Sequence, residues 1–173
     1  NKVYEVIEAR NIFKINYKKI KILIHPKSYV HAILKFDNGL TKIIAHDTTM
    51  KIPIFNTLYT NNDKKLKSKA IDINSLNNLN FKTIEFKRFP MVKLLNILPQ
   101  KQSLFETVIV SVNDTLVELF LNNKIKFIDI QKKLFKIINK KKFSKYKKKY
   151  PKKIKDIVEL NNYVRLITLE NSI

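Results

Sequence analysis

The sequence of 173 residues contains no cysteine and only one glycine. Without cysteine the chain can form no disulfide or thiolate metal site and has no cysteine nucleophile, which fits a reducing compartment. A single glycine excludes a glycine-rich phosphate loop of either nucleotide-binding type within these residues. Long apolar runs are also missing, and none reaches the roughly 18 residues that a membrane span requires. The remaining candidates are soluble globular proteins of other kinds.

Acidic residues are scarce as well. The chain has 14 Asp and Glu residues against 35 Lys and Arg residues, which gives a net charge of +21 and a pI near 10.0. Such a charge predicts attraction to phosphate backbones, so a basic nucleic-acid-binding module is one alternative function. The excess is almost entirely Lys, however, with Arg only at Arg10, Arg88 and Arg165. Together with many Asn and Ile, this bias favours AT-rich composition drift, since sequence-reading proteins use Arg for bidentate contacts.

The apolar spacing predicts mixed helix and strand in the first third of the chain. Helical spacing and strict alternation follow each other, and Asn38-Gly39 is a strong hairpin signal because both residues accept positive φ. The predicted elements are a helix over 1–13, strands over 20–25, 30–37 and 40–46, and a short helix near Pro53. This part is predicted to be mixed α/β.

The rest of the chain is predicted to be helical after a polar segment. Apolar residues three and four apart predict helices over 91–98, 103–122, 127–143 and 154–170. Short turns between them favour an antiparallel bundle. The predicted fold class is therefore α+β, with a mixed α/β part (helix, three strands, short helix) over 1–60, a linker over 61–86 and a C-terminal four-helix bundle over 87–173.

The lysine-rich run at 139–153 contains aromatic residues, which allows two interpretations. Aromatics among cations are typical of single-strand nucleic-acid binding. The favoured interpretation is a solvated turn between helices whose Phe143 and Tyr146 pack back onto the bundle, because no sheet platform or Arg accompanies the run.

Two places have residues suited to chemistry. His25 and His31 flank a turn at a strand end, where site residues concentrate, but their spacing matches no common zinc signature. Lys2 and Glu5 are three residues apart, so both point the same way from one helical turn. A carboxylate suits a hard divalent cation and Lys suits a phosphate, although the spacing alone favours an ordinary surface ion pair.

The order of motifs resembles one enzyme family. "NKVYEVIEARNIF", "IHPKSYVHAILKFDNG", "MKIPI", "FKRFPMVKL" and "VNDTLVELFLNNKIKFIDI" follow one another. This series is similar to the C-terminal part of 1-deoxy-D-xylulose 5-phosphate reductoisomerases, which use NADPH and a divalent metal in non-mevalonate isoprenoid synthesis. The resemblance implies that 1–60 completes a catalytic domain. It also accounts for a helix that begins at the first residue without Met, as expected of a piece of a longer protein.

The resemblance implies roles for individual residues. Asn1 and Lys2 match the pair that holds the phosphate and hydroxyl end of the substrate, and Glu5 matches a metal ligand that acts with an Asp-x-Glu pair from a preceding segment. Ser28 and His31 match residues of the substrate pocket, and Met50 matches one near the reacting end. Lys2, Glu5 and His31 are thus the expected catalytic residues.

The resemblance also implies what the whole protein binds. The expected cofactors are NADPH, with no binding residue in this stretch, and Mn2+, Mg2+ or Co2+. The expected ligand is a phosphorylated sugar, and the whole protein is expected to be a homodimer that binds neither nucleic acid nor membrane. The expected location is a bacterial cytoplasm, with a plastid as the alternative.

Departures from the family pattern leave a second alternative open. Val3 replaces a usual Gly, Thr49 replaces a usual acidic residue, and the run Asn-Ala-Ala-Asn-Glu becomes "VSVND", which keeps only Asn113 and an acidic Asp114. Because Lys2, Glu5, Ser28 and His31 are intact, we expect a divergent working enzyme. A catalytically dead scaffold of the same fold is the alternative.

Overall fold

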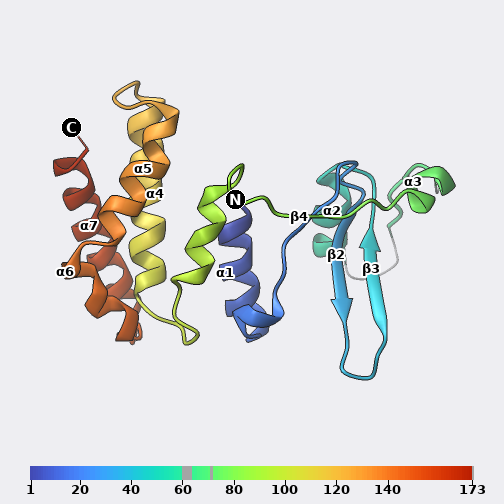
Figure 1. The fold of residues 1–173 in the computed structure, drawn as a ribbon. Helices are drawn as coiled ribbons and strands as arrows, with labels where there is room; N and C mark the ends of the chain where they lie inside the picture. Colours follow the sequence, from blue (N-terminus) through green and yellow to red (C-terminus); the bar gives the residue numbers. More distant parts are fainter. Residues whose placement is uncertain (60–63, 71, 173) are drawn as a thin grey trace. The chain divides into compact units, whose positions relative to one another are not determined.

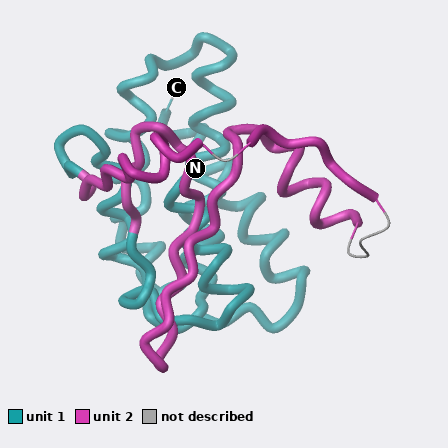
Figure 2. The backbone as a smooth tube through the Cα atoms, turned by 90° about the vertical axis from the view of Figure 1, so that its right-hand side faces the viewer, with its two compact units in different colours: residues 1–21, 85–173 teal, residues 22–84 magenta. Residues whose placement is uncertain are grey.

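The computed structural model describes residues 1–59, 64–70 and 72–172. These residues form two compact units, one made of 1–21 with 85–173 (unit 1) and the other of 22–84 (unit 2) (Figure 2). The α+β class and the C-terminal helical bundle are confirmed. The domain boundaries at 60/61 and 86/87 stay a prediction, and positions 60–63, 71 and 173 of the predicted segments lie outside the described residues.

Unit 1 is helical (Figure 1). Its elements are α1 (Lys2–Phe13), η1 (Tyr17–Lys19), η2 (Pro90–Asn96), α4 (Phe105–Leu121), α5 (Phe127–Ile138), α6 (Lys141–Ser144), η3 (Lys145–Lys148) and α7 (Ile154–Glu170). The predicted helix over 91–98 is a 3₁₀ helix, with Pro90 at its start. Among the described residues, no helix combines the length and apolar character needed to cross a membrane.

Helix α4 is the centre of unit 1. It packs against α5 and α7, and Phe105, Val108, Val112 and Leu116 on it are fully buried. These residues lie three or four apart, so they form one continuous apolar stripe along the helix. The stripe is the core that orders the bundle.

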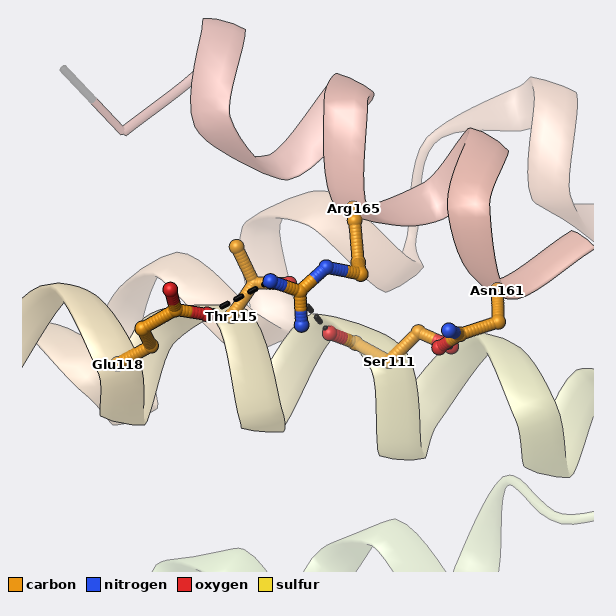
Figure 3. A network of polar contacts seen from close by, with 5 residues as sticks. All are labelled: Ser111, Thr115, Glu118, Asn161 and Arg165. Atoms are coloured by element: carbon orange, nitrogen blue, oxygen red, sulfur yellow. Dashed lines mark hydrogen bonds and ion pairs between the residues drawn. The ribbon is translucent and has the colours of Figure 1, made fainter.

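The interface between α4 and α7 also contains polar side chains that have partners (Figure 3). Ser111 Oγ lies 2.6 Å from Asn161 Oδ1, and the buried Thr115 hydroxyl donates to Ser111 O at 2.8 Å. Arg165 donates to Glu118 Oε2 at 2.7 Å on the exposed side. Since buried polar groups are costly without hydrogen bonds, these contacts fix which faces of α4 and α7 can meet.

Helix α1 belongs to unit 1 although it is distant from the bundle in sequence. Its buried face consists of Val3, Val6 and Ile7, and the helix packs beside η2. Just after it, the buried Tyr17 hydroxyl donates to Glu106 Oε1 on α4 at 2.7 Å. This hydrogen bond links the segment that follows α1 to the first turn of α4.

Unit 2 contains two small sheets and two short helices. Its elements are β1 (Leu23–Ile24), β2 (Val30–Lys35), β3 (Thr41–Ala45), α2 (Lys51–Leu58), α3 (Ile73–Asn77) and β4 (Lys82–Thr83). β2 and β3 form the predicted antiparallel hairpin, in which Gly39 has a φ of 87°. The predicted strand over 20–25 is only β1, which pairs with β4.

Helix α3 lies within the polar range predicted as a linker. Its start is stabilised locally, because Asp72 Oδ1 accepts the Asn74 backbone N–H at 3.0 Å and Asp72 Oδ2 accepts the Ser75 hydroxyl at 2.6 Å. Apolar periodicity cannot indicate such a short capped helix, since its formation depends on the cap and not on a buried face.

The lysine-rich run folds as α6 and η3, which are followed by an extended segment. Phe143 is fully buried, and its ring lies 6.4 Å from that of Tyr163, centre to centre. Tyr146 is half-buried beside Phe143. The interpretation that these aromatics pack onto the bundle is confirmed.

The hydrogen bond between Tyr17 and Glu106 gives a stability prediction. Tyr17→Phe should lower the free energy of unfolding by about 1–3 kcal/mol, because the buried Glu106 carboxylate loses its donor. Urea unfolding at neutral pH measures this change. Tyr150→Phe is the matched control: Tyr150 is exposed, and its substitution should stay within about 0.5 kcal/mol of the original protein.

The same pair gives a pH dependence. Burial and then the hydrogen bond to Glu106 raise the pKa of the Tyr17 hydroxyl above its ordinary value. Above about pH 10 the unfolded chain therefore releases this proton while the folded chain retains it, so stability falls as pH rises. Tyr17→Phe should show a smaller alkaline loss than the original protein. An equal loss in both would contradict the assignment.

Candidate functional site

The start of α1 brings three of the expected site residues together. Asn1 stands at the N-cap position, and its carbonyl accepts the backbone N–H groups of Tyr4 at 2.8 Å and Glu5 at 3.1 Å. One turn of helix places the Lys2 ammonium against the Glu5 carboxylate as an ion pair. The side chains of Lys2 and Glu5 are 63% and 50% exposed, so water screens the pair and either group is free to exchange partners.

A cavity of about 650 Å3 begins beside this turn, within unit 1. Asn1, Lys2 and Tyr4 form part of its wall. Arg88, just before η2, and Asn113, on α4, add further polar groups. Much of the remaining wall is apolar, supplied by η2, α4 and α5. Arg88 and Asn113 are candidate site residues that the spacing arguments missed, although each falls within a motif that carries the family resemblance.

Tyr4 connects α1 to the acidic position of the altered "VSVND" run. Burial and then the nearby Asp114 carboxylate raise the pKa of the Tyr4 hydroxyl above its ordinary value. Within the described part of the chain, the buried Tyr4 hydroxyl has no hydrogen-bond partner. Tyr4 therefore stays neutral at physiological pH.

Val3 and Thr49, two of the departures from the family pattern, are accommodated by the fold. Val3 is buried, whereas its neighbours Lys2 and Glu5 are exposed, so its extra volume packs into the interior. Thr49 Oγ1 accepts the Lys51 backbone N–H at 3.3 Å at the start of α2. These contacts give both residues a structural role.

The carboxylate of Glu5 suits one position in a divalent metal site. Oxygen is the donor that Mg2+ and Mn2+ prefer, and Glu5 is accessible with a single ammonium as its partner. Over residues 1–59, 64–70 and 72–172, no three His, Asp or Glu side chains gather as metal ligands would. The assignment of Glu5 as a metal ligand stays a prediction.

The other expected site residues lie in unit 2. Ser28 follows β1 in a tight turn, with a φ of 50° and its backbone N–H donated to His25 O at 2.9 Å. His31 lies on β2, and the exposed Met50 stands directly before α2. His25 packs its ring 5.3 Å from Phe81, centre to centre, and both its ring nitrogens are buried without a partner among the described residues.

The ring of His31 is stacked on that of His46. Their centres are 3.6 Å apart, the planes differ by 6°, and His31 Nε2 lies 3.3 Å from His46 O. A register shift between Val30 and Ala32 turns β2 locally, and His46 Nδ1 lies 2.6 Å from Asp47 O. No role for His46 was predicted from the sequence. The pairing of β2 with β3 brings it against His31, where its ring stacks on the His31 ring.

Comparisons with known proteins identify the family of the chain. A family model described as the DXP reductoisomerase C-terminal domain matches residues 46–167. The 1-deoxy-D-xylulose 5-phosphate reductoisomerase of Pelagibacter ubique (strain HTCC1062) is 61% identical over 166 residues, which are 96% of this chain and 43% of that protein. The protein of the same name from Sulfurihydrogenibium sp. (strain YO3AOP1) is 34% identical over 145 residues, which are 84% and 39% of the two chains.

Solved structures show the same fold. The reductoisomerase from Zymomonas mobilis in complex with NADPH superimposes with a TM-score of 0.76 at 25% identity, over 96% of this chain and 43% of that one. A DOX-P reductoisomerase in complex with NADPH, fosmidomycin and magnesium gives a TM-score of 0.84 at 24% identity, over 99% and 43%. The latter supports the fold alone.

The fold and the site define a chain of the α+β class in which a helical bundle supports a helix carrying a polar cluster. Because the family model covers most of its length, the chain belongs to the DXP reductoisomerase family. It spans 39–43% of the length of the two curated relatives.

The stacked histidines give a second stability prediction. His46→Ala should destabilise unit 2 by about 0.5–1.5 kcal/mol, since that is the usual value of an aromatic pair beyond its buried area. His46→Phe should restore most of the loss because it keeps a flat ring against His31. Amide hydrogen exchange in β2 and β3 measures the effect. Equal protection in His46→Ala and the original protein would contradict it.

Proposed function

We propose that this chain is the C-terminal part of a reductoisomerase that converts 1-deoxy-D-xylulose 5-phosphate to 2-C-methyl-D-erythritol 4-phosphate, using NADPH and a divalent metal. The observation that carries the proposal is the polar turn Asn1–Glu5 in a chain that belongs to this family. The identity of 61% to a protein bearing that name supports it.

The residues of α1 have roles that follow from their chemistry. The Lys2 ammonium, together with the Asn1 amide, binds the phosphate and hydroxyl end of the substrate, and it compensates charge there. Glu5 gives up its ion pair with Lys2 and contributes a carboxylate oxygen to the metal. Breaking the pair costs little because both groups are exposed, so one turn of helix can supply a cation and an anion to different parts of the site.

The remaining proposed contacts are those of Ser28, His31 and Met50. Ser28 and His31 line the substrate pocket, and Met50 lies near the reacting end of the substrate. Stacking against His46 restricts the His31 ring, so less conformational freedom is lost when it meets a substrate. The positive φ of Ser28 directs its hydroxyl from a tight turn, as expected of a residue that contacts a ligand.

The cofactors supply the chemistry that side chains cannot. When bound, the metal polarises the carbonyl of the substrate and the nicotinamide provides a hydride. The metal can be Mn2+, Mg2+ or Co2+, and NADPH has no binding residue in this chain. The structure of the Zymomonas mobilis relative with NADPH supports the cofactor.

The organisation of the whole protein is part of the proposal. Residues 1–60 complete the catalytic domain, 61–86 form a linker, and 87–173 form the helical domain that braces the site. Two such proteins assemble as a homodimer. Both curated relatives named above are bacterial, which favours a bacterial cytoplasm over a plastid.

Charge-neutral variants test the roles on α1. In a complete reductoisomerase that carries this chain, Glu5→Gln and Lys2→Gln should each lower kcat/KM by about 10²–10³-fold, since each removes a charge that stabilises the transition state. Glu5→Gln should also weaken Mn2+ binding measured by calorimetry, whereas Lys2→Gln should not.

Glu8→Gln is the matched control for these variants. Glu8 is exposed on the same helix, one turn beyond Glu5, and its substitution should change kcat/KM less than about twofold. An inactive complete protein with intact fold would support the dead scaffold, and full activity of Glu5→Gln would remove Glu5 from the metal site.

The chain by itself gives a further test. Glu5 lacks partner ligands among the described residues, so the 173-residue chain alone should not oxidise NADPH when substrate and Mn2+ are supplied. Absorbance of NADPH measures this directly. Turnover by the isolated chain would show that it holds a complete site.

A further inference from the structure

Unit 1 contains a second cavity with a very different lining. It has a volume of about 820 Å3 and is lined by eleven residues, of which Arg10, Lys14, Lys101, Lys147 and Lys148 are cations and none is acidic. We call these five residues and the cavity between them the basic pocket. The cations come from three parts of the sequence, so the fold, and not a local run of lysines, gathers them.

The first wall of the basic pocket is the end of α1. Arg10 lies in its last turn, and Lys14, with a φ of 56°, ends the helix in the left-handed conformation and turns the chain. Arg10 donates to Gln100 O at 2.9 Å and to Asn11 Oδ1 at 2.8 Å, and its guanidinium lies 5.6 Å from the centre of the Tyr17 ring. These contacts hold Arg10 in place.

The opposite wall is formed by η3 and the segment after it. Lys147 Nζ lies 4.8 Å from the centre of the buried Phe105 ring, and the Leu104 backbone N–H donates to Lys149 O at 2.7 Å. The cation–π contact positions Lys147, and the backbone bond joins the lysine-rich segment to the start of α4. Both walls are therefore anchored to α4.

The charge of the basic pocket is uncompensated. None of its lining residues is acidic, and the carboxylate of Glu106, which accepts the hydroxyl of Tyr17 beside Arg10, is buried. Like charges gathered in a concave surface repel one another and focus a positive potential. The neighbouring cavity differs, because Asp156 and Glu159 accompany its lysines. A bound anion is the simplest way to relieve this repulsion.

We propose that the basic pocket binds a small polyphosphate anion, with phosphoryl oxygens accepting hydrogen bonds from Lys101, Lys147 and Lys148. Its volume falls in the range of about 300–1,000 Å3 that small-molecule sites have. Lysine suits phosphate as a point charge with three donors. Phe143, in the same lysine-rich run, is buried and cannot stack on a base, whereas the exposed Tyr150 lines the pocket, so single-stranded RNA is the competing occupant that the test must separate.

The basic pocket is separate from the proposed catalytic residues. Lys2 and Arg10 are eight residues apart on α1, which is about 12 Å along the helix axis. The proposal does not depend on the proposed function, and the 173-residue chain contains every residue of the pocket. Its test therefore needs no activity.

The experiment is a titration of the 173-residue chain with tripolyphosphate at about 0.15 M ionic strength, where exposed charges are already screened beyond about 8 Å. We expect saturable binding by calorimetry, with backbone amide shifts concentrated at 100–102 and 147–150. The double variant Lys101→Gln/Lys148→Gln should weaken binding by about tenfold or more, because it removes two of five cations.

The matched control is Lys124→Gln/Lys132→Gln, which removes the same charge from exposed lysines outside the basic pocket. It should change the dissociation constant less than about twofold. Equal weakening in both double variants would overturn the proposal, because the affinity would then reflect net charge alone. The proposal would also fail if tripolyphosphate did not bind while single-stranded RNA bound and lost affinity in the pocket variant.

Discussion

The burial of α4 is the constraint on which the rest of unit 1 depends. Phe105, Val108, Val112 and Leu116 are fully enclosed, so every neighbouring element must cover part of this helix. The polar groups on it can then be satisfied only by particular partners. The buried Glu106 accepts the Tyr17 hydroxyl, and this contact links α4 to the segment that follows α1. Together with the packing of α1 beside η2, that attachment sets the position of the polar turn at the other end of α1.

The same attachment explains how a chain with a net charge of +21 can concentrate cations without losing its fold. Self-repulsion destabilises a compact state, and the apolar stripe of α4 together with its buried hydrogen bonds offsets it. Lys147 is held by the ring of Phe105, a residue of the core, and Arg10 by a backbone carbonyl. Neither cation forms an ion pair with a carboxylate of the described residues. The core thus positions charges that remain available to a ligand.

Local signals in the sequence predicted local structure well. The Asn38-Gly39 pair correctly predicted the hairpin, because Gly39 adopts the positive φ that the turn requires. The three-residue spacing of Lys2 and Glu5 correctly predicted that their side chains meet, because one helical turn brings them together. The strand predicted over 20–25 is longer than the observed β1, because the only partner of β1 among the described strands is β4, which has two residues. A strand's length depends on the segment it pairs with, and that segment is about 60 residues away.

Contacts between elements explain what could not be predicted at the site. His31 stacks on His46 across the β2–β3 hairpin, beside a register shift between Val30 and Ala32 that the sequence around the two histidines does not indicate. Arg88, which precedes η2, and Asn113 on α4 line the same cavity as Lys2, and η2 packs beside α1. Family resemblance could assign roles to matched positions, but it could not indicate which side chains hold them in place. Since a ligand site works only when its side chains are held, these supporting contacts decide whether a divergent sequence keeps its function.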